Sequence, residues 1–413
     1  MSRPRDGWEA TVISQGLTYP TTPHPDGSST NYWNESAWYE FTMGEVLTIE
    51  SATEELWGMC VQAVSRMARD LDDRRLGLPA GTLDYARRSI RRADPSVYGR
   101  FDLHFDGGDP KMLELNGDTP TGLIETAVTQ HFWREDTLPG LDQFNSVHER
   151  LLARWTELKE DPLAPRTMHF LWNDTDESGE EEMTVLYMMD VASQAGLQVY
   201  GQPITHVKWD YERLAFYDAL GQRIESAFKL YPWELMLGDE FGKVLLGGHE
   251  RQPVRWTEPP WKVLMSTKAI LPVLWEMFPD HPNLLPAFFD DPGDLLEWVA
   301  KPLHGREGDN IRIHTLSGPD LDTSDGGYGA EGYVYQEWCP LPSVDGNRPV
   351  LGSWVVDGQA AGMLVRESDG PVTDYYSRVC PHVISDGLAP DAVQVTAWLR
   401  ERVEVRDPTI DDT

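Results

Sequence analysis

Residues 99–121 (GRFDLHFDGGDPKMLELNGDTPT) constrain the fold of this chain more than any other stretch. Runs of alternating apolar and polar residues flank the turn-forming cluster DGGDP at 106–110, a pattern that predicts a β-hairpin. With this five-residue turn, Phe105 pairs with Lys111. One face of the hairpin is apolar and belongs in a core, and its members are Phe101, Leu103, Phe105, Leu113 and Leu115. The other face is polar and consists of Arg100, Asp102, His104, Glu114 and Asn116.

On the polar face, two carboxylates are expected to lie directly opposite each other. The same turn places Asp102 opposite Glu114 and Arg100 opposite Asn116. Like charges directly across strands destabilise a hairpin, whereas Mg²⁺ would hold both carboxylates and the amide oxygen as ligands. Arg100 beside them would suit a phosphate. Alternation alone favours an ordinary solvated face, and the alternative is a metal–nucleotide site.

The composition excludes several classes of protein. The 413-residue chain carries 68 acidic and 35 basic residues, which is a formal net charge of −33. A chain this acidic does not suit a nucleic-acid binder. It could steer a cationic substrate such as a polyamine, although a generally acidic surface is the simpler interpretation. The cysteines Cys60, Cys339 and Cys380 show neither zinc spacing nor a disulfide framework.

The expected location is the cytoplasm. No apolar run approaches the roughly 20 residues that a membrane span requires. The first residues, MSRPRDGWEATVISQG, also lack the apolar segment of a signal peptide. We therefore expect neither a membrane partner nor a nucleic-acid partner, and the sequence leaves the oligomeric state open.

The N-terminal region, residues 1–160, is expected to combine helices with the hairpin. Residues before about 50 are rich in Pro, Ser, Thr, Asn and aromatic residues, which indicates an irregular but packed segment. The capping box SATE at 51–54 predicts the start of a helix that ends near residue 69. Further helical patterns cover about 80–92, 122–133 and 141–158.

The next region, residues 165–250, alternates between strand and helix. The strand patterns MHFLWND and LQVYGQ flank a helical pattern at 183–196, which predicts a small α/β layer with a parallel sheet. Trp209 to Leu230 is expected to form a further hairpin with YDALGQR as its turn.

A third region, residues 260–400, follows the proline-rich segment RQPVRWTEPPWK at 251–262, the best candidate for a linker. The predicted elements are a helix over 267–278, strands over 298–301 and 333–338, and a hairpin around Asp357-Gly358.

Basic residues in the third region could bind phosphates. Lys301 ends a predicted strand and is followed by the glycine-bearing loop PLHGREG, which could let backbone N–H groups approach a nucleotide. This is neither a Walker A sequence nor a dinucleotide fingerprint. Lys268 at a helix start opposes the helix dipole, so it is either a solvated lysine or a phosphate ligand. Arg366 is either a strand-end arginine or a contact for an anionic substrate.

Other candidate motifs have simple structural interpretations. The acidic run Glu180-Glu181-Glu182 suits the first turn of a helix, and a polyamine site is the sharper alternative. The aromatic residues of FKLYPWELM at 228–236 indicate core or pocket wall. The histidines lack HExxH spacing, and no GxSxG motif or nucleophilic cysteine context is present.

Several long motifs resemble the glutathionylspermidine synthetase family. They are GRFDLHF…KMLELNGDTPT, WTEPPWKVLMSTKAILPVLWEMFPDHPNLLPA, KPLHGREGDN, YVYQEWCPLP and LVRESDGPVTDYYSR, in family order over about residues 10–400. The resemblance implies an α/β (α+β) ATP-grasp fold with mixed sheets and flanking helices, forming one unit over 1–413. It also implies a synthetase without the amidase half of bifunctional members.

The resemblance also implies roles for individual residues, with ATP and two Mg²⁺ ions as cofactors. The implied metal ligands are Asp102, Glu114 and Asn116. Catalytic roles fall on Arg100, Arg306 and Arg366. Nucleotide-binding roles fall on Arg100, Asp102, Lys268, Lys301, Arg306, Gly308, Gln336, Glu337, Trp338 and Cys339. Substrate contacts fall on Thr119, Thr121, Glu181, Glu182, Trp233, Glu234 and Arg366.

The expected reaction joins a carboxylate of a peptide or amino acid to a polyamine-like amine through an acyl phosphate. Leu230 and Leu235 stand where glutathione-binding members of the family carry threonines, which argues against glutathione as the acid. One alternative is a degenerate ATP-grasp scaffold with a nucleotide-binding or regulatory role. The other is a hydrolase that uses a carboxylate pair without a nucleotide.

Overall fold

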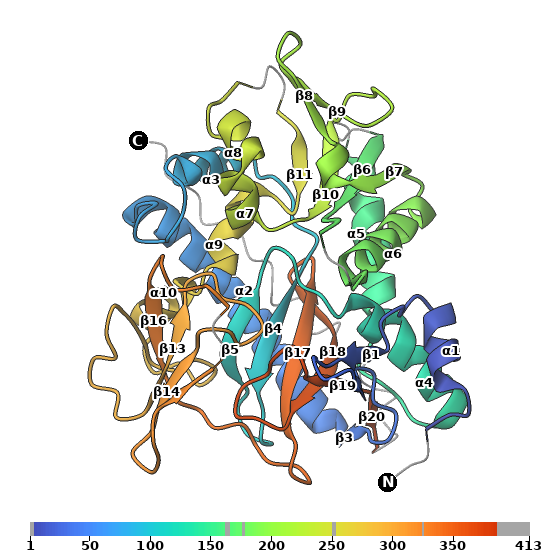
Figure 1. Ribbon diagram of the computed structural model, residues 1–413, viewed down its shortest axis with the longest axis vertical. Coiled ribbons are helices and arrows are strands. Elements are labelled where there is room, and N and C mark those ends of the chain that lie inside the picture. The colour runs from blue at the N-terminus through green and yellow to red at the C-terminus, as the bar shows by residue number, and fades with distance from the viewer. Residues whose placement is uncertain (1–3, 162–165, 176–177, 250–252, 324–325, 386–413) are drawn as a thin grey trace.

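A computed structural model describes residues 4–161, 166–175, 178–249, 253–323 and 326–385 of the protein. Three larger sheets organise it (Figure 1): a central antiparallel sheet of five strands, a parallel sheet of four strands, and a second antiparallel sheet of five strands. The expected α/β (α+β) class, with sheets of both kinds and flanking helices, is confirmed.

The central sheet carries the predicted hairpin. Its strands, in spatial order, are β19 (Arg378–Cys380), β18 (Gln359–Ser368), β17 (Arg348–Val356), β4 (Tyr98–His104) and β5 (Lys111–Asn116). The turn between β17 and β18 lies at Asp357-Gly358, as predicted. Leu351 to Val356 of β17 pair with β4, so the hairpin of β4 and β5 is held in a larger sheet.

Both predicted polar pairs of the hairpin are present. Arg100 lies opposite Asn116, and Asp102 lies opposite Glu114. Strand β4 is buried along its whole length, because β5 and β17 cover its two edges and other elements cover its faces. Asp102 is buried and Glu114 is partly buried, so solvent screens the repulsion of this pair only partly.

The predicted register is wrong next to the turn. A β-bulge after the second polar pair shifts the remaining partners, so His104 rather than Phe105 lies opposite Lys111. Met112 is fully buried in the core, at the place expected for Leu113. Leu113 instead lines the cavity described below.

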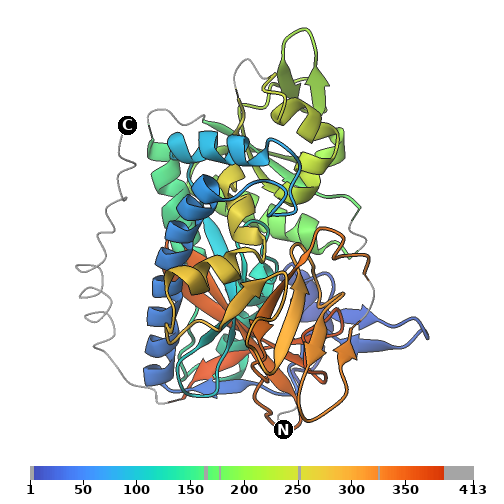
Figure 2. The ribbon, with the colours of Figure 1, turned by 90° about the vertical axis from the view of Figure 1, so that its left-hand side faces the viewer.

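Helix α2 (Met43–Asp70) packs against β17 and β18, and Figure 2 shows it running along one side of the molecule. Its cap is Thr42, whose hydroxyl accepts the N–H of Glu45 at 3.2 Å while the Glu45 carboxylate accepts the N–H of Thr42 at 2.7 Å. This reciprocal capping box satisfies two backbone donors at the helix start. The predicted box at 51–54 therefore lies inside the helix rather than at its beginning.

The predicted parallel sheet is present, and it is larger than expected. Its strands are β11 (Arg255–Thr257), β10 (Ser226–Leu230), β6 (Thr167–Trp172) and β7 (Gln198–Pro203). Helices α5 (Val147–Glu160) and α6 (Glu180–Gln194) pack against each other, and α6 also contacts β6 and β7. The strand–helix–strand unit thus buries its helix on the sheet, as βαβ units do.

Two predictions for this region are wrong. The hairpin expected over 209–230 does not form, because β8 (Lys208–Asp210) pairs with β9 (Ala215–Tyr217) before the predicted turn and β10 joins the parallel sheet between β6 and β11. The segment YDALGQR does turn, and a bridge between Tyr217 and Arg223 closes it. The expected linker at 251–262 contains β11 and the 3₁₀ turn Pro260–Lys262, both packed into the fold. Residues 250–252 of that segment lie outside the described residues.

The third sheet carries the predicted lysine strand. Its order is β12 (Ala287–Phe289), β16 (Tyr333–Glu337), β13 (Trp298–Pro302), β14 (Arg312–His314) and β15 (Leu321–Asp322). The helix expected over 267–278 is present as α10 (Ile270–Met277), and a separate short helix, α9 (Val263–Ser266), precedes it. Lys268 lies between them, so it does not open a helix of its own.

The remaining elements surround these sheets. They are α1 (Trp8–Ser14), β1 (Thr21–Pro23), β2 (Ser29–Asn31), β3 (Tyr39–Phe41), α3 (Thr82–Arg91), a π-helix (Glu125–Thr129), α4 (Gln130–Thr137), a 3₁₀ turn (Ile204–His206), α7 (Trp233–Gly238), α8 (Glu240–Leu245) and β20 (His382–Ile384). The N-terminal segment is thus less irregular than expected, and the helix expected over 122–133 contains a π-turn. Within the described ranges, no helix has the length and apolar character that crossing a bilayer demands.

A buried ion pair joins the hairpin to the parallel sheet. Lys229 on β10 is fully buried, and its Nζ lies 2.8 and 3.0 Å from the carboxylate oxygens of Asp118, which follows β5. The N–H of Trp233 donates to the same carboxylate at 2.8 Å. Burial raises the pKa of Asp118 to about 6, against the opposing charge of Lys229. Burial likewise lowers the pKa of Lys229.

Lys229→Met should therefore destabilise the fold strongly. The substitution leaves the Asp118 carboxylate buried without its cation, which costs about 3–5 kcal/mol. Urea unfolding followed by tryptophan fluorescence would measure the loss. Lys243→Met is the matched control, because Lys243 pairs with Glu240 on the surface, where an exposed ion pair contributes little to stability. Equal midpoints for the two variants would contradict the assignment.

Candidate active site

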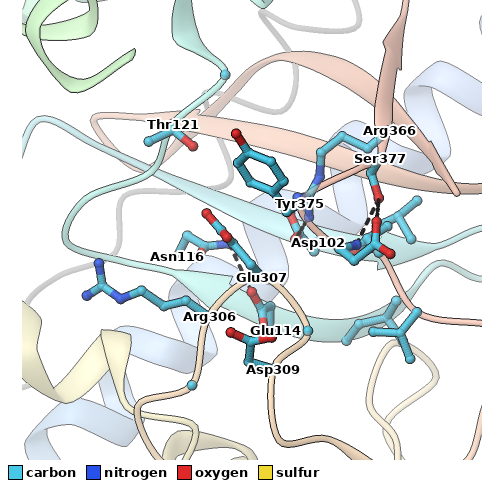
Figure 3. A pocket seen from close by; sticks show the side chains of 18 of the residues that line it. Asp102, Glu114, Asn116, Thr121, Arg306, Glu307, Asp309, Arg366, Tyr375 and Ser377 are labelled. Atoms are coloured by element: carbon cyan, nitrogen blue, oxygen red, sulfur yellow. Dashed lines mark hydrogen bonds and ion pairs between the residues drawn. The ribbon is translucent and has the colours of Figure 1, made fainter. Parts of the chain in front are cut away.

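A cavity of about 840 Å³ is lined by residues from all three larger sheets (Figure 3). Figure 3 shows side chains converging on it from β4 and β5, from β18, and from the loop after β13. Most of the predicted site residues line it: Arg100, Asp102, Glu114, Asn116, Thr119, Thr121, Glu181, Glu234, Lys268, Lys301, Arg306, Gly308, Gln336, Glu337, Trp338, Cys339 and Arg366.

Asp102 lies between two arginines. Its Oδ1 accepts from Nε of Arg100 at 3.1 Å, and its Oδ2 contacts a guanidinium nitrogen of Arg366 at 2.5 Å. Arg100 also donates to the backbone carbonyl of Thr121 and lies 5.9 Å from the ring centre of Trp354. These contacts fix both guanidinium groups in one place, with their remaining donors available to an anion.

Glu114 faces the lysines of the third sheet. Its Oε2 lies 3.3 Å from Nζ of Lys268, and Asn116 donates to its other oxygen at 3.3 Å. Burial alone would raise the pKa of Glu114, but the charges of Lys268, Lys301 and Arg366 outweigh it and lower that pKa to about 2. Glu114 is therefore an anion throughout the neutral range.

Lys301 on β13 of the third sheet contacts the hairpin through its side chain. Its Nζ donates to the carbonyl of Leu113 and to the side-chain oxygen of Gln336, both at 2.8 Å. The amide of Gln336 in turn donates to the carbonyl of Met112 at 3.0 Å. Burial lowers the pKa of Lys301 to about 8, with Glu114 opposing the shift. A polyanionic ligand would stabilise the charged form of this lysine and so raise its pKa again.

The donor set fits a hard cation. Asp102 and Glu114 offer carboxylates from directly opposed positions, and Asn116 adds an amide oxygen. No group of three or more His, Cys, Asp or Glu residues in the described part of the chain could hold a metal by itself. Mg²⁺ is usually bound by one or two carboxylates together with substrate phosphates and water. This pattern of donors suits Mg²⁺ brought in with a nucleotide.

The loop after β13 crosses the cavity. Arg306 on this loop forms an ion pair with Glu234 of α7. Burial raises the pKa of Glu234, but Arg306 and His304 outweigh it, so the net pKa is lowered. Gly308 has φ +72°, and a Cβ there would lie 2.6 Å from the carbonyl oxygen of Thr373, so glycine is required. The loop can therefore pass close to the segment after β18.

Comparison with known proteins identifies the family. The family model described as "Glutathionylspermidine synthase preATP-grasp" matches residues 1–385. The chain belongs to the glutathionylspermidine synthase family. The fold is also similar to a solved glutathione synthetase-like effector from Globodera pallida, with a TM-score of 0.53, 10% identity, and 93% of this chain and 98% of that chain covered.

This chain spans different shares of two relatives. A Haemophilus influenzae protein named "Putative acid--amine ligase" is 38% identical over 381 residues, covering 90% of this chain and 95% of the relative. The bifunctional glutathionylspermidine synthetase/amidase of Escherichia coli is 26% identical over 385 residues, covering 85% of this chain and 60% of the relative. Membership of this family implies ATP-dependent ligation of a carboxylate to an amine.

Some residues that the family resemblance pointed to lie elsewhere. Trp233 is fully buried, and its indole N–H donates to the carbonyl of Glu258 at 3.2 Å, so it belongs to the core rather than to the cavity wall. Glu182 is not among the residues that line the cavity, although its neighbour Glu181 is. Of the two leucines that replace threonines, Leu230 lines the cavity and Leu235 is exposed at the surface.

The cavity also contains residues that the sequence patterns did not single out as site residues. Tyr19 and Tyr32 come from the N-terminal segment. Tyr375 and Ser377, which follow β18, are labelled in Figure 3. The motif LVRESDGPVTDYYSR contains the second pair and could have pointed to it. No local pattern marks Tyr19 or Tyr32, because the segment that carries them reaches the cavity only through the tertiary fold.

Proposed function

We propose that this protein is an ATP- and Mg²⁺-dependent ligase that joins the carboxylate of a peptide or amino acid to a polyamine-like amine. The observation that carries the proposal is the opposed pair Asp102 and Glu114, surrounded by four cations in one cavity: Arg100, Arg366, Lys268 and Lys301. The cations suit the phosphates of a nucleoside triphosphate, and the carboxylates suit the Mg²⁺ that accompanies it.

The nucleotide is proposed to bind between the central and third sheets. Lys268 and Lys301 would contact its phosphates, and the backbone of Gln336 to Cys339 would contact the base. Asp102, Glu114 and Asn116 would hold Mg²⁺, which supplies charge neutralisation for phosphoryl transfer. Arg306 would leave Glu234 and join the phosphates as the loop closes, which keeps water away.

Chemistry is proposed at Arg100 and Arg366. These two guanidinium groups would orient the acid so that a carboxylate oxygen attacks the γ-phosphorus, which forms an acyl phosphate and releases ADP. They would also stabilise the charge on the transferring phosphoryl group. The amine nitrogen then attacks the acyl carbon, and phosphate leaves. Thr119 and Thr121 would contact the acid, and Glu181 would attract the cationic amine.

The carboxylate-pair hydrolase is less well supported by this geometry. Such an enzyme needs one carboxyl group that stays protonated as the general acid. Asp102 is instead paired with two arginines, and the pKa of Glu114 is lowered to about 2. Neither group is therefore suited to donate a proton.

ADP release with paired panels of acids and polyamines tests the proposal. We expect ADP release from Mg-ATP to require an acid, to continue over many turnovers only when an amine is also present, and to give a product whose mass equals acid plus amine less one water. Nucleotide binding without turnover across the whole panel would instead support the scaffold alternative. Turnover of ATP that gives no product of this mass with any acid–amine pair would contradict amide formation.

A further inference from the structure

A buried carboxylate beside the cavity has no role in the proposed function so far. Glu125 begins the π-helix Glu125–Thr129 and is fully buried. Its Oε1 accepts from the hydroxyl of Tyr32 at 2.6 Å, whereas its Oε2 has no hydrogen-bond partner among the described residues. A buried carboxylate with one oxygen unsatisfied is costly. Such a cost in a native fold calls for a functional explanation.

Two tyrosines connect Glu125 to the cavity. Tyr32 and Tyr19 both line it, with their ring centres 5.6 Å apart. The hydroxyl of Tyr19 is also buried, makes no hydrogen bond of normal distance and angle in the described ranges, and interacts electrostatically with Glu125. Glu125 interacts electrostatically with Arg100, and Tyr32 with Arg366. Tyr32 and Glu125 therefore lie within electrostatic range of the arginines that frame Asp102.

The hydrogen bond to Glu125 determines what Tyr32 can offer a ligand. Its hydroxyl proton points to the carboxylate, so the oxygen presents lone pairs to other donors. A hydroxyl that donates to a carboxylate is polarised into a better acceptor. An ammonium group is a natural donor for this oxygen. The same end of the cavity carries Glu180 and Glu181, which would attract it.

We propose that Tyr32 contacts the nitrogen of the amine substrate and relays its proton to Glu125. This inference rests on the proposed ligase function and adds two residues to it. An N–H bond of the ammonium breaks, its proton moves to the Tyr32 oxygen, and the Tyr32 proton moves to Oε1 of Glu125. The freed lone pair forms the C–N bond while the bond from the acyl carbon to the phosphate oxygen breaks, and the second proton of the nitrogen leaves on the phosphate.

Burial prepares both groups for these roles. It raises the pKa of Glu125, chiefly by desolvation, which makes the carboxylate a better proton acceptor. Burial also raises the pKa of Tyr32 well above its usual value. Tyr32 therefore takes up one proton as it gives the other to Glu125, and does not stay ionised. Tyr32 is then the catalytic residue, and Glu125, which acts through it, is the positioning residue.

A second tyrosine–glutamate pair provides the matched control. The hydroxyl of Tyr39 donates to Oε2 of the buried Glu367 at 2.9 Å. Neither residue lines the cavity. Tyr39→Phe therefore removes the same kind of hydrogen bond as Tyr32→Phe, but away from the proposed substrates.

The test compares spermidine with hydroxylamine as the amine, using an acid that supports ADP release. Hydroxylamine is uncharged at neutral pH and needs no proton acceptor before it attacks. We expect Tyr32→Phe and Glu125→Gln to lower amide formation from spermidine by about a hundred-fold. Hydroxamate formation should stay within about threefold of wild type, and Tyr39→Phe should change neither rate.

Equal losses with both amines, or no loss with spermidine, would overturn the relay. Calorimetric titration of spermidine into the Mg-ADP complex adds a readout without turnover, in which Tyr32→Phe should weaken binding about tenfold. Unchanged spermidine binding in this variant would overturn the contact. If wild type forms neither product with any acid, the proposed ligase fails, and the titration still decides whether Tyr32 binds the amine.

Discussion

Asp102→Asn is expected to lower ATP-dependent ligation by about 10³-fold, the loss typical of removing a group that stabilises charge in a transition state. The change keeps the size of the side chain but removes its negative charge. Arg100 and Arg366 then lose their common partner, which contacts them at 3.1 and 2.5 Å. A proposed metal ligand is lost at the same time. The steady-state rate of ADP release would measure the effect.

Two measurements separate the metal role from a general disturbance. Half-maximal activity of Asp102→Asn should need more Mg²⁺ than wild type, because loss of one ligand weakens the site. Asp106→Asn is the control, since Asp106 lies in the exposed turn of the same hairpin, where it accepts the N–H of Gly108. Full activity of Asp102→Asn at the wild-type Mg²⁺ requirement would refute the assignment.

The sequence predicted the hairpin well because alternation determines which residues share a face. Arg100 and Asn116 pair as expected, as do Asp102 and Glu114. The bulge beyond them could not be predicted, since it leaves the alternation of each strand nearly unchanged. As a result, Leu113 lines the cavity instead of packing in the core.

Helix boundaries show the same limit of local patterns. Thr42 to Glu45 and Ser51 to Glu54 both fit a capping box, and only packing of the helix on β17 and β18 selects the first. Strand β10 was assigned to the wrong partner for a related reason. A short apolar run predicts a strand but not its partners. The partners of β10 are β6 and β11.

The candidate site was predictable where residues follow one another in motifs and not where they meet through the fold. Lys301 and Arg306 lie in one motif, and both line the cavity. Trp233 lies in an aromatic motif that core and cavity wall share, and here it is core. Tyr32 and Glu125 are far apart in the sequence, and their 2.6 Å hydrogen bond has no local signal.

Lys301→Met is expected to weaken ADP binding by roughly 10³-fold, the upper part of the range for truncating one partner of a buried charge pair. The methionine keeps the apolar stem but leaves Gln336 and the carbonyl of Leu113 without their donor. Glu114 also loses a cation that lowers its pKa. Titration calorimetry with Mg-ADP would measure the dissociation constant.

The pH dependence of that binding distinguishes a charge effect from lost packing. The pKa of Lys301 is about 8 without nucleotide, and a polyphosphate favours the protonated form, so binding raises this pKa. By linkage, affinity is then constant below pH 8 and falls above it, by about tenfold from pH 7 to 9. Lys301→Arg keeps its charge and should lose this slope, whereas the exposed Lys208→Met should retain it. An unchanged slope in Lys301→Arg would show that another group titrates.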